Sequence, residues 1–208
     1  MLFESCSGGG GRFDPGFLYY MPQTWASDNT DAICRQKIEY ATSLAYPAIT
    51  VGSHVSISPN EQVGRITPLS TRGYVAMSGN FGYELDLGKL SADEKNEIRQ
   101  QVALYKELRP IIQFGTHHRL LSPFECNETA WLFVSQDSSD VVVFYFKILG
   151  EPSTPVRILR LRGLDPNAEY QETASGKIYG GDELMYVGLT VPVAFGDFTS
   201  HMWRFHCL

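Results

Sequence analysis

The chain has 208 residues, and 43% of them are hydrophobic, which is enough apolar material for one large or two small globular units. Its formal net charge of −6 argues against a nucleic acid or an anionic membrane surface as the binding partner. No apolar run approaches the roughly 20 residues that span a bilayer, and no basic, apolar signal peptide opens the chain.

The histidines and cysteines form neither a metal-binding nor a disulfide pattern. The five histidines, two of which are the adjacent His117 and His118, lack the spacing of metal ligands, so we expect no metal site. The four cysteines include no Cys-x-x-Cys pair, which favours reduced thiols in a cytoplasmic protein. They are Cys6, Cys34, Cys126 and Cys207.

The first part of the chain, residues 1–118, alternates between strand and helix patterns. An apolar strand at residues 1–5 opens into four glycines, where the backbone can approach a ligand closely because no Cβ is in the way. A second strand is predicted at residues 17–21 and leads toward Asp28. A helix with a regularly spaced apolar face begins near Thr30.

Two more strand–helix modules follow. The third strand, residues 48–51, precedes a helix at 69–77, and a short fourth strand lies near 80–82. Residues 91–94 form a capping box, which opens a helix that we expect to end at Pro110. Four strand–helix modules amount to half of a (β/α)8 barrel, a fold that builds its active site at the carboxyl ends of its strands.

The second part, residues 119–208, consists of strand-like runs separated by turn residues. The runs are rich in β-branched and aromatic residues, and the last of them alternates as a half-buried strand should. We therefore predict a small antiparallel β-sandwich. The runs are residues 131–134, 141–149, 156–161, 184–191 and 202–207.

Asp28 is the strongest candidate for a catalytic residue. It follows Trp25 at a strand end, where an aromatic wall can exclude water and keep a carboxylic acid protonated near neutral pH. An aspartate at this place is also suited to cap the following helix, and Asp31 fits that role as well or better. Both interpretations of Asp28 are open at this point.

The thiol and the glycine loop also admit two interpretations. Cys6 and Gly9 either form the wall of a ligand pocket, or Cys6 is a buried structural cysteine and Gly9 is part of a flexible loop. The loop is not a phosphate loop, because no Gly-Lys-Ser/Thr string follows it. Trp25 is suited to stack on a sugar, but a tryptophan more commonly fills a core. We expect structural or solvated roles for Arg12, Asp14, His54, Glu84 and Asp86.

Four strings of this sequence resemble those of the family 36 glycoside hydrolases, the bacterial retaining α-galactosidases. The strings are CSGGGGRFDPG at residues 6–16, PQTW at 22–25, SDNTDA at 27–32 and GYELDL at 82–87. They occur in the order expected of that family, and the resemblance covers the whole chain. Family members are several times longer, with an N-terminal β-sandwich before an eight-stranded barrel, so the chain resembles their C-terminal portion alone.

The resemblance implies that residues 1–118 form the fifth to eighth strands of a (β/α)8 barrel, before a β-sandwich at 119–208. It implies hydrolysis of terminal α-linked galactose from melibiose and raffinose by retaining double displacement, without a cofactor. Asp28 matches the general acid/base of the family's Ser-Asp-x-x-Asp string. Cys6 and Gly9 match the Cys-x-x-Gly loop that packs against the sugar's 2-hydroxyl. A homo-oligomer is expected for the full-length enzyme.

One family signature is missing. The family's nucleophile lies in a Lys-Trp-Asp-Met-Asn-Arg-like string at the end of the fourth barrel strand, and this sequence contains no such string. Two other classes of function are therefore open. One is a non-catalytic or vestigial carbohydrate-binding protein, and the other is a related galactosyltransferase, since the acceptor side is built largely by residues outside this sequence.

The chain on its own is expected to hydrolyse no aryl α-galactoside, because double displacement needs a nucleophile opposite Asp28. A half-barrel would also leave two strand edges open and expose an apolar inner face, so we expect its barrel part to self-associate. The measurement is hydrolysis by the purified chain, with Asp28→Asn as the control. Activity that depends on Asp28 would mean that a nucleophile lies within these residues.

Overall fold

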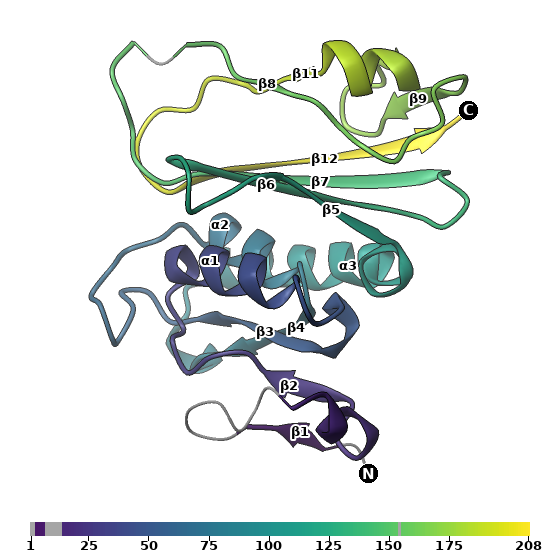
Figure 1. The fold of residues 1–208 in the computed structure, drawn as a ribbon. Helices are drawn as coiled ribbons and strands as arrows, with labels where there is room; N and C mark the ends of the chain where they lie inside the picture. Colours follow the sequence, from purple (N-terminus) through teal and green to yellow (C-terminus); the bar gives the residue numbers. More distant parts are fainter. Residues whose placement is uncertain (1–2, 7–13, 154) are drawn as a thin grey trace. The chain divides into compact units, whose positions relative to one another are not determined.

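The computed structural model describes residues 3–6, 14–153 and 155–208, and its chain divides into two compact units (Figure 1). The units are Met1–Gln113 and Phe114–Leu208. The predicted division between residues 118 and 119 falls inside strand β5 (Thr116–Leu121). This strand pairs with β6 (Glu128–Val134) from its first residue, so all of it belongs to the second unit.

The first unit contains a four-stranded parallel sheet with the order β1-β2-β3-β4. Parallel strands have their carboxyl ends at one edge, so the segments that follow all four strands leave the sheet at the same edge. The strands are β1 (Glu4–Ser5), β2 (Gln23–Trp25), β3 (Val51–Ser56) and β4 (Asn80–Glu84).

Three helices connect or follow these strands: α1 (Ala32–Thr42), α2 (Leu69–Ala76) and α3 (Ala92–Phe114). The predicted capping box at the start of α3 is confirmed, since Ser91 and Glu94 exchange hydrogen bonds of 2.9 and 3.2 Å between backbone N–H and side chain. The predicted end of this helix at Pro110 is wrong. The buried residues Ile111 and Ile112 continue the helix past the proline, because their packing outweighs the lost backbone hydrogen bond.

The second strand also differs from the prediction. Residues 15–19 form the 3₁₀ helix η2 (Pro15–Tyr19), and β2 begins four residues later. The Asp14 carboxylate caps η2 by accepting a hydrogen bond of 2.8 Å from the Gly16 N–H, and Pro15 has the backbone angle of a first helical residue. Tyr19 is 86% exposed, so the aromatic run that suggested a strand is not a buried one.

The third strand begins at Val51, because the three residues before it form the 3₁₀ helix η3 (Ala48–Thr50). One face of the sheet packs on the helices, where Val55 lies in a cluster with Leu69 and Ala76 of α2. The Ser53 hydroxyl on the same face donates a hydrogen bond of 3.0 Å to Glu39 of α1.

The opposite face of the sheet is polar. A Cβ at Gly52 would lie 2.6 Å from the Glu4 carboxylate and 3.0 Å from the Gln23 amide, so these side chains share that face. Gln23 donates to Glu4, and Asn80 donates to the Gln23 Oε1 at 2.8 Å. The predicted apolar inner face is therefore wrong, because the alternate positions that face away from the helices carry polar side chains or glycine, apart from Trp25.

The second unit is antiparallel. Its large sheet has the order β10-β9-β12-β7-β6-β5, and a separate two-stranded sheet pairs β11 with β8. The predicted strands at 131–134, 141–149 and 202–207 are confirmed as β6, β7 and β12. The bounds not yet given are β7 (Asp140–Lys147), β8 (Ile158–Leu159), β9 (Glu169–Glu172), β10 (Ile178–Gly180), β11 (Leu189–Thr190) and β12 (Thr199–Cys207).

The predicted strand at residues 184–191 is largely wrong. Its first part is the π-helix η5 (Glu183–Val187), which begins where Asp182 accepts a hydrogen bond of 2.8 Å from the Glu183 N–H. Gly188 ends the helix with a left-handed φ of 98°, and only the two residues of β11 then pair with β8.

Both sheets of the second unit contribute to one hydrophobic core. Leu159 and Leu189 of the two-stranded sheet lie in the same buried cluster as Leu132, Val143 and Trp203 of the large sheet. Among the described residues of both units, none belongs to a helix that is long and apolar enough to cross a membrane.

Candidate active site

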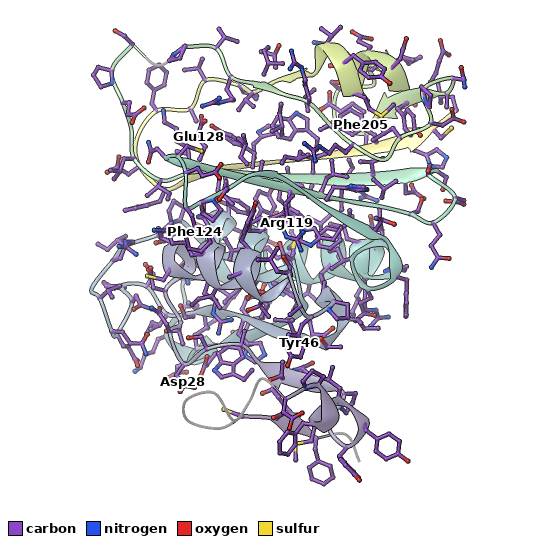
Figure 2. All side chains as sticks on the ribbon, viewed as in Figure 1. Asp28, Tyr46, Arg119, Phe124, Glu128 and Phe205 are labelled. Carbon is purple, nitrogen blue, oxygen red and sulfur yellow. The ribbon has the colours of Figure 1, made fainter. Side chains whose placement is uncertain are left out.

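The carboxyl edge of the parallel sheet brings together the two predicted site residues that the structure describes. Cys6 directly follows β1, and β2 pairs with β1 in parallel register. Asp28 lies three residues beyond the end of β2 (Figure 2). Both residues are exposed. The third predicted site residue, Gly9, and also Arg12 lie outside the described residues.

The backbone around Asp28 is held by Arg35 of helix α1. The guanidinium donates to the carbonyl of Ser27 at 2.9 Å and to that of Asn29 at 3.1 Å, the residues on either side of Asp28. Arg35 is 1% exposed, so few other conformations are open to it. Its contacts fix the two carbonyls that flank Asp28.

Arg35 is itself fixed by a buried charge and an aromatic ring. Its third contact is an ion pair of 3.1 Å with Glu39, one turn further along α1. Its guanidinium carbon lies 4.0 Å from the ring centroid of Trp25. Burial raises the pKa of Glu39, while the Arg35 charge and the hydroxyl of Ser53 act in the opposite direction.

Asp31 fills the helix-capping role that the sequence left open between Asp28 and Asp31. Its carboxylate accepts a hydrogen bond of 2.9 Å from the Cys34 N–H and forms an ion pair with Arg65. Asp31 is 1% exposed, whereas Asp28 remains at the surface of the described chain. The cap therefore leaves Asp28 outside the helix, on the loop that precedes it.

Trp25 contacts a second ring besides the Arg35 guanidinium. The centroid of its ring is 4.6 Å from that of His54. Burial lowers the pKa of His54, and the carboxylates of Glu4 and Glu84 oppose that shift. The pKa shift favours the neutral form of His54 at pH 7, so this side chain adds little charge to the edge of the sheet.

Glu84 and Asp86 take the solvated or structural roles expected of them. Glu84 is exposed, and the Asp86 carboxylate accepts a hydrogen bond of 2.8 Å from the Gly88 N–H at the start of a short turn. Within residues 3–6, 14–153 and 155–208, no group of three or more histidine, cysteine, aspartate or glutamate side chains could hold a metal ion. All four cysteines are unbridged.

The sequence interpretation missed Arg35, Gln62 and Asn60. Gln62 and Asn60 lie on the loop after β3 and contact the segment around Asp28. The Arg35–Glu39 spacing of four residues on a predicted helix was the one available signal, because it places two opposite charges on one face. No local pattern marks Gln62 or Asn60, since their partners lie about thirty residues away.

Two family models match this chain. The model of the melibiase family matches residues 1–115, and the model of the glycosyl hydrolase family 36 C-terminal domain matches residues 128–205. The chain belongs to the melibiase family. The predicted resemblance to family 36, and to a C-terminal portion of its members, is thereby confirmed.

Curated relatives and solved structures agree with this assignment. The chain is 62% identical over 204 residues to α-galactosidase AgaA of Geobacillus stearothermophilus and 50% identical over 205 residues to α-galactosidase 1 of Pediococcus pentosaceus. The match covers 98% and 99% of this chain but 28% of each relative. A crystal structure of an AgaA variant in complex with raffinose matches with a TM-score of 0.97 and 60% identity, over 100% of this chain and 29% of that one. The chain thus spans less than a third of the proteins it matches.

Removal of the Arg35 charge is expected to destabilise the first unit by about 3–5 kcal/mol, because Arg35→Met leaves Glu39 buried without its partner. The test uses an exchange enzyme, in which residues 1–208 replace the matching stretch of AgaA. The measurement is amide hydrogen exchange in α1. Arg99→Met, an exposed arginine of α3, is the matched control and is expected to change little.

The loss of stability of the first unit in Arg35→Met is expected to grow as pH rises. With Arg35 gone, burial keeps the folded-state pKa of Glu39 above its unfolded value, so a proton stabilises the folded form at low pH and is lost at higher pH. The double variant Arg35→Met/Glu39→Met is expected to recover part of the loss. A loss that is independent of pH and unchanged in the double variant would contradict this account of the pair.

Proposed function

We propose that this chain supplies the acid/base side of the active site of a retaining α-galactosidase that acts on raffinose-type and melibiose-type oligosaccharides. The observation that carries the proposal is the position of Asp28, at the carboxyl edge of a parallel sheet on a loop whose flanking carbonyls are held by Arg35. Support comes from the α-galactosidase relatives and from the AgaA variants crystallised with raffinose and with stachyose.

In this proposal the four parallel strands are the fifth to eighth strands of a (β/α)8 barrel, and the two antiparallel sheets form a β-sandwich. Parallel order across all four strands, with helices on one face, supports the barrel assignment. The shared core of the large and small antiparallel sheets supports the sandwich. The polar opposite face of the parallel sheet then points into the barrel.

The chemistry proposed for Asp28 has two steps. In the first, a carboxylate nucleophile from outside these residues forms a bond to the anomeric carbon, the glycosidic bond breaks, and the Asp28 proton passes to the leaving oxygen. In the second, Asp28 takes a proton from water as the water oxygen attacks the anomeric carbon and displaces the nucleophile. Asp28 must be protonated at the start, which the negative charge of the nucleophile and burial by the rest of the barrel would favour.

Cys6 and Gly9 are proposed to face the 2-hydroxyl of galactose. Cys6 is exposed directly after β1, next to the strand that leads to Asp28, which supports a place in the same pocket. A small thiol and a residue without Cβ leave room for a plain hydroxyl at that carbon of the sugar.

Asp28→Asn in the exchange enzyme is expected to lower kcat/KM for raffinose by roughly 100-fold or more, because the amide cannot protonate the leaving oxygen. For an aryl α-galactoside with a good leaving group, kcat/KM is expected to fall much less, since that oxygen needs little protonation. Azide, which needs no base, is expected to restore kcat on the aryl substrate.

The matched control is Asp93→Asn, an exposed aspartate of α3 whose change is expected to leave both substrates within about twofold of the parent. Equal losses on both substrates for Asp28→Asn would contradict the acid role. A folded exchange enzyme with no activity on any α-galactoside would overturn the proposed function itself.

Enlargement of Cys6 tests the pocket wall. Cys6→Tyr in the exchange enzyme is expected to weaken inhibition by galactose about tenfold or more, because the larger ring occupies the space of the 2-hydroxyl. Cys126→Tyr, at an exposed cysteine of the second unit, is the control for a surface tyrosine. Unchanged galactose inhibition in Cys6→Tyr would remove Cys6 from the site.

A further inference from the structure

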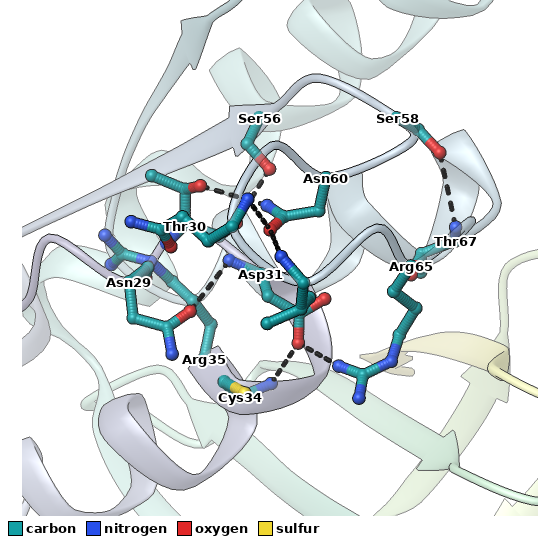
Figure 3. Close-up of polar contacts among 12 residues, drawn as sticks. Asn29, Thr30, Asp31, Cys34, Arg35, Ser56, Ser58, Asn60, Arg65 and Thr67 are labelled. Atoms are coloured by element: carbon teal, nitrogen blue, oxygen red, sulfur yellow. Dashed lines mark hydrogen bonds and ion pairs between the residues drawn. The ribbon is translucent and has the colours of Figure 1, made fainter.

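The loop between β3 and α2 is hydrogen-bonded to the loop that carries Asp28. Figure 3 shows Ser56 and Asn60 at Thr30 of that loop. The Ser56 hydroxyl, at the end of β3, donates to the Thr30 carbonyl at 2.7 Å. The Asn60 amide donates to the Thr30 hydroxyl at 3.0 Å. Two chain segments about thirty residues apart in sequence are thereby fixed to each other.

Gln62 contacts the backbone of the candidate acid itself. Its side-chain Nε2 donates to the Asp28 carbonyl at 2.7 Å, and its Oε1 accepts from the Thr30 N–H at 3.1 Å. One planar amide thus bridges the peptide groups on both sides of Asn29. Both ends of the amide are used, so this pair of bonds fixes orientation as well as distance.

The Gln62 backbone is in turn held by Asn60. The Asn60 Oδ1 accepts from the N–H of Gln62 at 3.0 Å and from the N–H of Val63 at 3.2 Å. Asn60 is 4% exposed, so this turn is anchored from its buried side. The Gln62 side chain therefore extends toward Asp28 from a fixed base.

The contacts of Gln62 complement those of Arg35. Arg35 binds the carbonyls of Ser27 and Asn29, whereas Gln62 binds the carbonyl between them. Three consecutive carbonyls centred on Asp28 are thus each held by a side chain from outside the loop. These contacts fix the backbone from which the Asp28 side chain extends, and a general acid must lie within about 3 Å of the leaving oxygen.

We propose that Gln62 is a positioning residue for Asp28, which sets the backbone from which the acid reaches the glycosidic oxygen. The inference rests on the proposed function, since it assigns Gln62 a role in that same reaction. Gln62 acts through the peptide of Asp28 and touches no substrate, so its loss is expected to affect the proton-transfer step and to leave sugar binding intact.

The test is Gln62→Ala in the exchange enzyme. We expect kcat/KM for raffinose to fall roughly 10- to 100-fold, in line with the effect of an acid displaced by about 1 Å. We expect kcat/KM for the activated aryl galactoside, and inhibition by galactose, to change less than about threefold, because neither depends on leaving-group protonation.

A pH profile provides a second readout that a purely structural role would not move. The basic limb of kcat/KM for raffinose reports ionisation of the general acid. A loosened loop lets Asp28 reach solvent, where the carboxylate is more stable, so we expect this limb to shift to lower pH in Gln62→Ala. Gln136→Ala is the matched control, since Gln136 is also exposed and donates one hydrogen bond of 3.3 Å to a backbone carbonyl, that of Phe114 in the second unit.

The outcomes separate this inference from the proposed function. If Asp28→Asn shows the split between substrates and Gln62→Ala behaves like Gln136→Ala, the positioning role is wrong and the proposed function stands. If Asp28→Asn lowers kcat/KM equally on raffinose and on the aryl galactoside, the acid role of Asp28 is wrong, and the positioning role of Gln62 is wrong with it. Should Gln62→Ala not fold, Gln62→Asn keeps the amide but shortens its reach by one methylene, and the same split is expected. Equal losses on both substrates in the folded variant would overturn the inference.

Discussion

The first unit depends on one buried guanidinium. Arg35 contacts the backbone on both sides of Asp28, the Glu39 carboxylate and the face of Trp25, so a helix, a strand and the loop between them meet at a single side chain. The planar fork of arginine satisfies these acceptors at once, which a lysine could not do. The Glu39 carboxylate makes burial of that charge tolerable, and it also balances the cation close to Asp28. An unbalanced arginine at this place would favour the ionised form of the residue that the proposed mechanism needs as an acid.

The parts of the fold that sequence predicts well are those with local causes. The start of α3 follows from Ser91 and Glu94, whose capping box is complete within four residues. Strands β6 and β7 follow from apolar runs, and β12 follows from its alternating pattern. The errors arise where a local pattern competes with another cause. The apolar run at residues 17–21 suggested a strand, but Asp14 and Pro15 set the start of a 3₁₀ helix there. Residues 184–187 have strand composition, yet the cap by Asp182 begins a π-helix there.

The residues of the candidate site also divide into those that the sequence predicts and those that it does not. Cys6 and Asp28 were found because parallel strands deliver their carboxyl ends to one edge and because the strings around them resemble a known family. The residues that hold Asp28 in place were not found, because their roles exist only in three dimensions. Gln62 is an ordinary polar residue of a surface loop until the fold brings it to the carbonyl of Asp28. Only the Arg35–Glu39 pair had a signature in the sequence, and its spacing predicts a helical ion pair without indicating what the guanidinium binds.

The polar face of the parallel sheet changes what the proposed half-barrel is expected to expose on its own. Gln23 links Glu4 to Asn80, and Asn80 also accepts from Gln113 at 2.9 Å, so these groups already have partners within the chain. Self-association through a bare apolar face therefore has little basis in the described residues. The remaining cause of self-association is the edge of the sheet, where a strand presents a row of backbone N–H and C=O groups. In the proposed barrel such edges are closed by pairing, so strand pairing, and not burial of an apolar face, is the interaction by which the other strands of that barrel would complete the fold.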